Sequence, residues 1–405
     1  MIRNIIFVFV LCIPIFSFGQ GYQVNLQGQK QIGMASAGTG LALDEAAVFF
    51  NPGAVSMLQN NAVSAGISPL FLKTAFQQTG SFTTEHNESE VGTPIMAYGV
   101  WGPASGKYKL GLGVYTPFGG LTNWGQNWSG QYVLTSLNLR AIFIQPTISI
   151  KLTDNLGIGA GFVYNTGSVD LQRRIPITNS NGEPGSARLK GTGDGYGWNA
   201  GIFYKTNFGL SVGFTHRSKV ITKLDDGDAI FDVPASLAST FPTKFSSQLP
   251  LPATTSIGLG YDVNPKLLLA LDVNYVHWSV YESLNFDYDN NTRIPDTNSP
   301  RNYKDGGALR LGGQYQHTDK LALRAGVGYA LTPVRDGYVT PETPDANRLF
   351  LSAGVGYQIS DKFGIDASFF FQGVEKRTST NIETQLSGAY KSNVYIPGIS
   401  VSYRW

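Results

Sequence analysis

Strict alternation of apolar residues with polar residues or glycine is the feature that most constrains how this chain folds. The alternation runs through residues 266–275, 320–330, 348–360 and 393–405. Because successive side chains of a β-strand point to opposite faces, each run places one apolar row on a single face. A soluble strand lasts about five or six residues, whereas a tilted membrane strand needs about nine to eleven. The sequence therefore predicts an all-β fold, a transmembrane antiparallel β-barrel.

The number of alternating segments supports a closed barrel. We count about fourteen of them, and bacterial single-chain barrels have an even number of strands. The segments begin near Ala62, Thr93, Lys107, Arg140, Asn155, Gly195, Phe208, Ala253, Lys266, Gly306, Lys320, Arg348, Lys362 and Asn393. We therefore predict a barrel of about fourteen strands that occupies residues 62–405.

The connections between these segments alternate in length. Short turns such as Asp154-Asn155 and Asp361-Lys362 alternate with long polar loops such as 77–92, 174–194 and 332–347. Outer-membrane barrels have short periplasmic turns and long extracellular loops. A large soluble β-sandwich is the alternative, and it has no reason to separate loop lengths in this way. The pattern also leaves the segment before the first strand at the periplasmic end.

The start of the chain is typical of an exported protein. Arg3, the apolar run 5–16 and the small-x-small sequence Ser17-Phe18-Gly19 together predict a signal peptide over residues 1–19. The run is too short for a membrane helix, which needs about 20 apolar residues. The single cysteine, Cys12, lies inside it, so we expect a mature chain without disulfides.

Residues 20–61 differ from everything that follows. Several glycines interrupt any long helix, and no alternation lasts long enough for a membrane strand. One short helical stretch stops at Asn51-Pro52-Gly53, because the residue before a proline is pushed out of the α region. A compact, irregular segment of small residues is typical of something packed inside a shell. We interpret residues 20–61 as a hatch, or plug, in the barrel lumen.

Composition and motifs argue against catalysis. A net charge of +2 over 405 residues gives no field that would attract nucleic acid. Gly157-x-Gly159-x-Gly161 lies within an alternating strand, so it does not indicate a dinucleotide site. There is no nucleophile elbow, and the histidines stand on separate segments without metal-ligand spacing. We therefore expect no cofactor, no metal and no enzyme activity, with an outer-membrane lipase or protease as the rival class. The histidines are His86, His216, His277 and His317.

A set of short motifs, in this order along the chain, carries a resemblance to a known family. They are Asn51-Pro52-Gly53 and the segments 115–119, 195–202, 216–220, 249–252, 278–279, 303–305 and 344–348. The chain resembles the FadL/TodX family of outer-membrane transporters of long-chain fatty acids and other hydrophobic compounds. One departure is visible, since the usual Asn-Pro-Ala of the family's hatch is Asn-Pro-Gly here.

The resemblance implies a mechanism as well as a fold. It implies a fourteen-stranded barrel closed by an N-terminal hatch, with a kinked third strand through which an apolar substrate leaves sideways into the bilayer. The third segment, 107–118, suits a kink: Pro117 removes a ladder hydrogen bond next to Phe118, and Gly119-Gly120 lets the backbone bend. We expect Asn51-Pro52-Gly53 to pack beneath that opening. The plainer alternative is that Pro117 only ends the strand.

Four basic residues are candidates for holding a substrate head group. Arg173 and Arg174 end the fifth strand, while Arg301 and Lys304 enter the tenth, and the family places cations in both neighbourhoods. The alternative for each is that it faces water or the phosphates of lipopolysaccharide. Burial of a substrate tail in an apolar groove contributes about 0.8 kcal/mol of binding free energy per CH₂.

We therefore predict passive transport of hydrophobic small molecules, foremost fatty acids. Alkanes or aromatic hydrocarbons taking the same route are the alternative. A polar-solute porin or adhesin belongs to a different class, and a hatch in a wide barrel argues against free diffusion.

The predicted location is the outer membrane of a Gram-negative-type cell envelope. We expect a monomer in contact with outer-membrane lipid and lipopolysaccharide. Trp405, after Val401 and Tyr403, resembles the C-terminal aromatic signal read by the barrel-assembly machinery.

Overall fold

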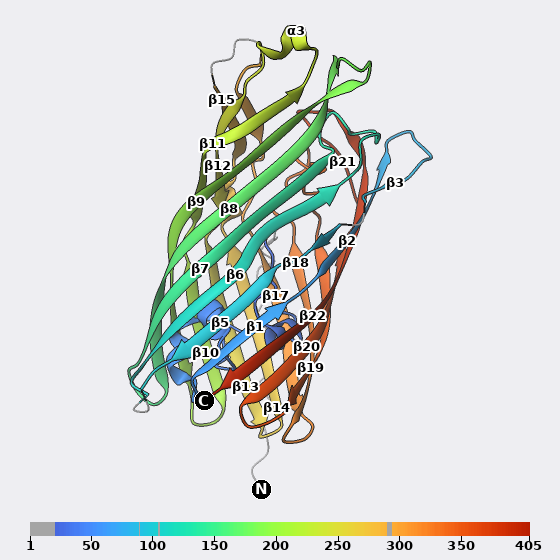
Figure 1. Ribbon diagram of the computed structural model, residues 1–405. Coiled ribbons are helices and arrows are strands. Elements are labelled where there is room, and N and C mark those ends of the chain that lie inside the picture. The colour runs from blue at the N-terminus through green and yellow to red at the C-terminus, as the bar shows by residue number, and fades with distance from the viewer. Residues whose placement is uncertain (1–20, 89, 104–105, 290–293) are drawn as a thin grey trace.

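The computed structural model describes residues 21–88, 90–103, 106–289 and 294–405, and these form one closed antiparallel β-barrel of 14 strands (Figure 1). The barrel closes because β1 (Ala62–Ile67) pairs with β22 (Ser387–Arg404) on one side and with β5 (Ile95–Trp101) on the other. The all-β fold and the number of strands predicted from the sequence are confirmed.

Several membrane strands are each divided into two shorter elements. The undivided strands are β6 (Tyr108–Asn123), β7 (Ser136–Lys151), β8 (Leu156–Thr178), β9 (Pro184–Lys205), β18 (Leu321–Leu331), β19 (Arg348–Gln358) and β22. The divided strands are β1 with β2 (Leu70–Gln78), β10 (Leu210–Arg217) with β11 (Val220–Asp232), β12 (Lys244–Leu251) with β13 (Thr254–Asn264), β14 (Leu267–Val276) with β15 (Ser283–Tyr288), β16 (Thr297–Pro300) with β17 (Gly306–Gln316), and β20 (Phe363–Val374) with β21 (Arg377–Thr380). β5, between β1 and β6, completes the wall, and the two-residue strands β3 (Glu85–His86) and β4 (Val91–Gly92) pair with β2.

The alternation in sequence corresponds to the two faces of the wall. In β19 the side chain of Leu351 is 46% exposed on the outer surface, whereas that of Phe350 is 1% exposed inside the barrel. Lipid is the solvent of the outer face, so apolar side chains there replace the polar ones of a soluble sheet. The register predicted from the alternation is therefore the one that the structure adopts.

Tyrosines end many of the apolar rows near the short turns. This is the place of an aromatic girdle at the periplasmic interface, where an amphipathic ring lies at the level of the lipid head groups. The tyrosines are Tyr204, Tyr261, Tyr315, Tyr357 and Tyr403.

The barrel is not equally tall on all sides. β8 has 23 residues and β9 has 22, about twice what is needed to cross a bilayer. Their outer halves, together with β11, β12 and β15, rise as a wall that carries the short helix α3 (Ala235–Ala238) at its top (Figure 1). Only one side of the barrel is extended in this way.

Residues 21–61 fill the lumen at the periplasmic end. They contain α1 (Gln29–Ile32), α2 (Ala47–Phe50) and the 3₁₀ helix η1 (Pro52–Met57), whose side chains are mostly buried (Figure 1). No helix in the described part of the chain is both long and apolar enough to cross a membrane. The predicted signal peptide, 1–19, lies outside the described residues.

Inward-facing polar side chains of the wall satisfy the irregular backbone of the hatch. The carboxylate of Asp272 in β14 accepts hydrogen bonds from the N–H groups of Gly38 and Thr39, each at 2.9 Å. The hydroxyl of Ser352 in β19 accepts one from the N–H of Ala35 at 2.7 Å. A buried backbone donor without a partner is costly, so these strand residues fix where the hatch lies.

Candidate functional site

The pairing of the third membrane strand, β6, is irregular next to Pro117. Between Tyr115 and Phe118 the pairing of β6 with β7 shifts. Phe118 comes three residues after Tyr115, whereas their partners in β7, Phe143 and Ala141, are only two residues apart. One extra residue therefore makes a β-bulge, which bends a strand and increases its twist. Pro117 lies in the bulge and has no N–H to offer the ladder.

The kink coincides with an interruption of the wall. β5 pairs with β6 only from Met96 opposite Tyr115 downward. Farther up on this side, the N–H of Glu88 donates to the carbonyl oxygen of Asn123 at 2.7 Å. Across the opening, the edge of β2 is already paired with β3 and β4. We call the edge of β6 from 116 to 122 the wall gap.

Within the described residues, the backbone partners of the wall gap come from the hatch. The N–H of Val24 donates to the carbonyl oxygen of Pro117 at 2.8 Å, and the N–H of Gly119 donates to that of Tyr22 at 3.1 Å. The side chain of Gln27 donates to the carbonyl oxygen of Thr116 at 2.9 Å. The start of the hatch thus adds a short strand to the open edge of β6.

Asn51-Pro52-Gly53 lies elsewhere than we expected. Instead of packing beneath the kink, Asn51 donates through Nδ2 to the carbonyl oxygen of Ile202 in β9 at 3.0 Å. A Cβ added at Gly53 would come within 2.8 Å of the carbonyl oxygens of Gly157 and Gly201. The motif therefore fixes the hatch to β8 and β9, whose inward glycines leave room for it, whereas bulky Tyr115 and Phe118 fill the inner side of β6.

Those contacts also explain two of the three alternating glycines of β8. A Cβ at Gly157 would collide with the carbonyl oxygen of Gly53, and one at Gly159 with that of Pro52. Gly157 and Gly159 are therefore a docking surface for the hatch, whereas Gly161 lies against Thr147 and Asn199 of the wall.

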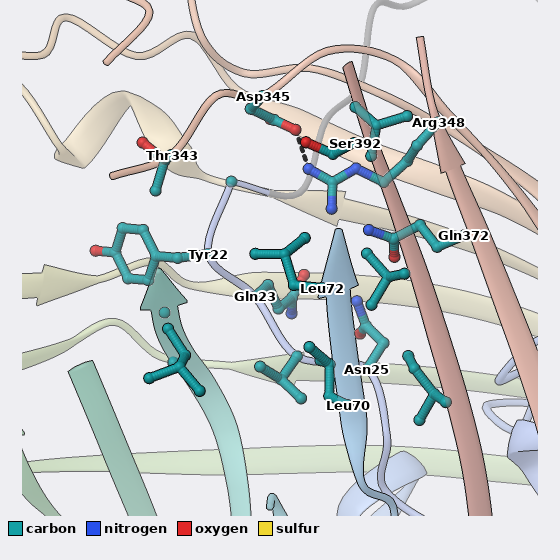
Figure 2. A pocket seen from close by; sticks show the side chains of 18 of the residues that line it. Tyr22, Gln23, Asn25, Leu70, Leu72, Thr343, Asp345, Arg348, Gln372 and Ser392 are labelled. Carbon is teal, nitrogen blue, oxygen red and sulfur yellow. Dashed lines mark hydrogen bonds and ion pairs between the residues drawn. The ribbon is translucent and has the colours of Figure 1, made fainter. Parts of the chain in front are cut away.

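Two cavities flank Tyr22. The first, which we call the outer cavity, measures about 60 Å³ and is lined mainly by leucines of the tall wall, with Leu139, Leu171 and Leu249 among them. The second, which we call the gap cavity, measures about 160 Å³ and lies beside the wall gap, against β2, β20 and β22 (Figure 2). Tyr22 and Glu342 line both cavities.

Tyr22 is held in place by other aromatic rings. Its ring centroid lies 4.6 Å from that of Trp278, 5.7 Å from that of Tyr281 and 6.1 Å from that of Phe118, all in edge-on contact. Its hydroxyl donates to the carbonyl oxygen of Pro250 at 3.0 Å. Such pairs contribute about 0.5–1.5 kcal/mol each, so the ring is a stable partition between the cavities.

The structure separates the four candidate cations. Arg173 shares the inward face of β8 with Leu171, is exposed, and has no ion-pair partner among the described residues. Arg174, on the opposite face, donates to the carbonyl oxygen of Pro184 at 2.6 Å. Lys304 is bonded through its backbone N–H to Pro333. Among the described residues, neither the Arg173 guanidinium nor the Lys304 ammonium has an ion-pair partner, and Arg173 is the more exposed of the two.

Arg301 already has a partner. Its Nη2 donates to the Glu342 carboxylate at 2.7 Å, and both side chains are buried. The carboxylate of Glu342 supplies the counter-charge for this buried guanidinium. The pair anchors the loop 332–347 over the two cavities.

Sequence reasoning missed Tyr22 and Glu342. Tyr22 precedes the glycine-rich stretch, and Glu342 stands in a polar loop. Neither position has a local pattern that reveals its role, because each acts through residues far away in the chain.

The comparisons with known proteins agree with this architecture. A family model described as "Outer membrane protein transport protein (OMPP1/FadL/TodX)" matches residues 10–405. The chain is 24% identical over 429 residues to a long-chain fatty acid transport protein of Escherichia coli O6:H1, with 96% of this chain and 95% of that protein covered.

Two solved structures share the fold. A Pseudomonas aeruginosa FadL homologue matches with a TM-score of 0.82 and 21% identity, over 95% of this chain and 99% of that one. The Pseudomonas putida toluene transporter TodX matches with a TM-score of 0.73 and 16% identity, again over 95% and 99%. With a family match over nearly the whole chain, this outer-membrane β-barrel belongs to the FadL/TodX family of proteins that transport hydrophobic compounds.

Proposed function

We propose that this protein carries long-chain fatty acids passively across the outer membrane and releases them sideways through the wall gap. One observation carries the proposal: the kinked edge of β6 lacks β5 as a partner, and the start of the hatch takes its place, from Tyr22 to Val24. The protein is then a transporter without catalytic chemistry.

The outer cavity supports capture of the substrate. Leucines of the tall wall line it, and each CH₂ of a tail buried among them gains about 0.8 kcal/mol. Arg173, above this apolar surface, orients the carboxylate toward the extracellular side.

The weak closure of the wall gap supports lateral exit. Two backbone hydrogen bonds and one from Gln27 hold residues 22–27 to β6. Each hydrogen bond contributes about 0.5–1.5 kcal/mol net, so the strand-edge contact itself breaks at modest cost. The packing of the Tyr22 ring on Trp278 and Tyr281 adds to the cost of moving the whole segment. The remainder of the hatch stays bound through Asp272, Ser352 and Asn51.

Neutral hydrocarbons are the second candidate cargo. The outer cavity is mostly apolar, and the TodX structure that shares this fold is named as a toluene transporter. A polar-solute porin is disfavoured because the hatch fills the periplasmic end of the lumen with buried side chains.

A reversible crosslink tests lateral exit. Gln23 of the hatch lies directly opposite Phe118 of β6 as an antiparallel bridge, a pairing whose Cα separation suits a disulfide. In the double variant Gln23→Cys, Phe118→Cys, oxidation should block oleate uptake by reconstituted vesicles, and reduction should restore it.

The matched control places the disulfide within the wall, with Ala325→Cys and Ala353→Cys, which are opposite one another in β18 and β19. Its uptake should not change with redox state. Unchanged oleate uptake with the hatch crosslink fully formed would show that residues 22–24 need not move, and lateral exit at this place would be abandoned.

A further inference from the structure

Arg217 is a buried cation at the upper end of β10, on the inward face of that strand. The residue is only 8% exposed, and its hydrogen-bond partners in the described part of the chain are all neutral acceptors. A buried charge without a counter-charge is costly, and an apolar side chain of similar volume would avoid that cost. The charge of Arg217 therefore needs a role other than filling space.

The guanidinium of Arg217 joins the wall to the hatch. Nη1 donates to the hydroxyl of Tyr115 in β6 at 2.6 Å and to the side-chain oxygen of Gln145 in β7 at 2.9 Å. Nη2 donates to the carbonyl oxygen of Phe49, in the hatch helix α2, at 3.2 Å. Gln145 in turn donates to the carbonyl oxygen of Val48 in the same helix at 2.7 Å. Together these bonds fasten α2 to β6, β7 and β10.

Two aromatic rings pack around the charge. The guanidinium carbon of Arg217 lies 4.9 Å from the centre of the Phe49 ring and 5.5 Å from that of the Tyr115 ring. The two ring centres are 5.1 Å apart, in edge-on contact. A cation is attracted to the face of an aromatic ring, most strongly where water is excluded. The charge therefore holds a ring of the hatch and a ring of the wall at the same time.

Tyr115 stands where the wall gap begins. It is the uppermost residue of β6 that pairs with β5, and the bulge at Pro117 starts directly above it. The next residue, Thr116, accepts a hydrogen bond from Gln27 of the hatch. Arg217 therefore binds β6 at the lower end of the wall gap, one residue away from the place where the start of the hatch docks.

The start of the hatch is tied to the rest of the hatch by bonds of its own. Ser36 donates through its hydroxyl to the carbonyl oxygen of Asn25 at 2.6 Å, and the N–H of Ile32 donates to the carbonyl oxygen of Gly28 at 2.8 Å. The position of the hatch body therefore decides how often residues 22–27 meet the edge of β6. A fixed hatch body raises the effective concentration of the hatch start at that edge, as a linker of matched length does for two binding sites.

We propose that Arg217 is a positioning residue for the wall gap. By holding Phe49 and Tyr115 together, it keeps the start of the hatch aligned with the open edge of β6 and so keeps the gap closed in the resting protein. This inference rests on the proposed function, to which it adds the residue that sets how readily the gap opens. Within the described residues, the linings of the outer cavity and the gap cavity do not include Arg217, so the role requires no contact with the substrate.

Arg217→Met tests the role, because methionine is also long and unbranched but carries neither the charge nor the hydrogen bonds. Docking of the hatch start is measured without substrate, by amide hydrogen exchange in the full-length protein. The reporters are the N–H groups of Val24 and Gly119, which bond to Pro117 and Tyr22 across the gap. Their exchange should be about tenfold faster in the variant, because the loss of a charged hydrogen bond weakens a contact by about that factor.

The same variant should take up oleate faster. In reconstituted vesicles the uptake rate should rise about three- to tenfold, whereas the Kd for oleate should stay within about twofold because the leucines of the outer cavity are unchanged. General damage would instead lower assembly, binding and uptake together. Arg217→Lys should give intermediate exchange and uptake, since an ammonium keeps the charge but lacks the planar fork that spans all three acceptors.

Lys109→Met is the matched control. Lys109 is also a buried cation on the inward face of β6, and its Nζ donates to the carbonyl oxygen of Asn60 at 2.9 Å. It lies six residues before Tyr115, toward the periplasmic end. Lys109→Met should change neither the exchange of Val24 and Gly119 nor the uptake of oleate. Heat-modifiability on gels shows whether each variant is assembled.

A double variant tests whether Arg217 acts through Tyr115. Tyr115→Phe removes the hydroxyl that Arg217 binds and should accelerate exchange at the gap by itself. Adding Arg217→Met should then increase exchange by less than the product of the two single effects, because both substitutions remove the same contact.

The outcomes separate this role from the general function. A wild-type protein that takes up no oleate would refute the proposed function, and the exchange rates would still decide whether Arg217 positions the hatch. Unchanged exchange in assembled Arg217→Met, or oleate uptake that falls instead of rising, would overturn the positioning role while transport stands. Weaker oleate binding with unchanged exchange would also overturn it, since Arg217 would then act on the substrate itself.

Discussion

The backbone N–H of Val24 lies 2.8 Å from the carbonyl oxygen of Pro117, the residue that kinks the third membrane strand. The contact is a strand-edge hydrogen bond, made where the wall lacks its own neighbour. An exposed strand edge is a template for pairing with another segment. In this barrel the start of the hatch occupies that edge, so the same chain supplies both the open edge of β6 and the segment that pairs with it.

Removal of the Tyr22 ring should join the outer cavity to the gap cavity. In Tyr22→Ala, the packing on Trp278 is lost, and we expect faster oleate influx into vesicles together with weaker oleate binding. Tyr22→Phe is the control, since it keeps the ring and removes only the hydroxyl bond to Pro250. Equal influx rates for the two variants would show that the ring is not the partition.

Substitutions of Arg173 and Arg174 should affect oleate binding differently, although the two residues are neighbours in sequence. Arg173→Gln should weaken oleate binding several-fold and reduce its dependence on salt, because the cation faces the substrate and a screened charge pair is removed. Arg174→Gln should not, since that side chain binds Pro184 on the opposite face. Equal effects, or none in either variant, would favour a solvated or lipopolysaccharide-facing role.

Loss of the Glu342 carboxylate should loosen the loop above the cavities. In Glu342→Gln, Arg301 is left buried without its counter-charge, which costs about 3–5 kcal/mol when a buried pair is broken. Amide hydrogen exchange in residues 332–347 should accelerate, and oleate should slow it again because its carboxylate replaces that of Glu342.

Asp336→Asn in the same loop is the control. Asp336 is 98% exposed in its pair with Arg377, and such surface pairs contribute about 0–1 kcal/mol. Exchange that accelerates equally in both variants would contradict a specific role of Glu342.

A charge on the lipid face should impair assembly. Leu351→Arg places a cation in the bilayer, at a cost of about 2–4 kcal/mol near the midplane. Heat-modifiability on gels should show less folded protein than for Leu351→Phe, which keeps the position apolar beside Phe371. Equal folding of the two would mean that Leu351 does not face lipid.

The last residue should matter for assembly. Trp405 is 54% exposed, stacks on Tyr403 with ring centroids 5.9 Å apart, and donates its backbone N–H to the carbonyl oxygen of Asn61 at 3.0 Å. Deletion of Trp405 should lower the yield of protein in the outer membrane, whereas Trp405→Phe should largely preserve it. Unchanged yield after deletion would make Trp405 an ordinary girdle residue.

Much of the fold could be predicted because membrane strands obey a local rule. A side chain such as Leu351 faces lipid because its neighbours in sequence point the other way, and no distant residue is needed to decide this. The same holds for the kink, since the missing N–H of Pro117 disrupts the ladder wherever the strand lies. The alternation and the strand number were therefore determined by the sequence itself.

The tertiary structure alone decided what meets inside the lumen. Asn51 binds Ile202, and Tyr22 binds Pro250, across 151 and 228 positions of the chain. Whether Arg301 is available to a substrate depends on the carboxylate of Glu342, which a separate loop supplies. These contacts follow from which strands face each other across a closed barrel and from how the hatch folds within it. Such geometry is a property of the whole barrel, and no short stretch of sequence contains it.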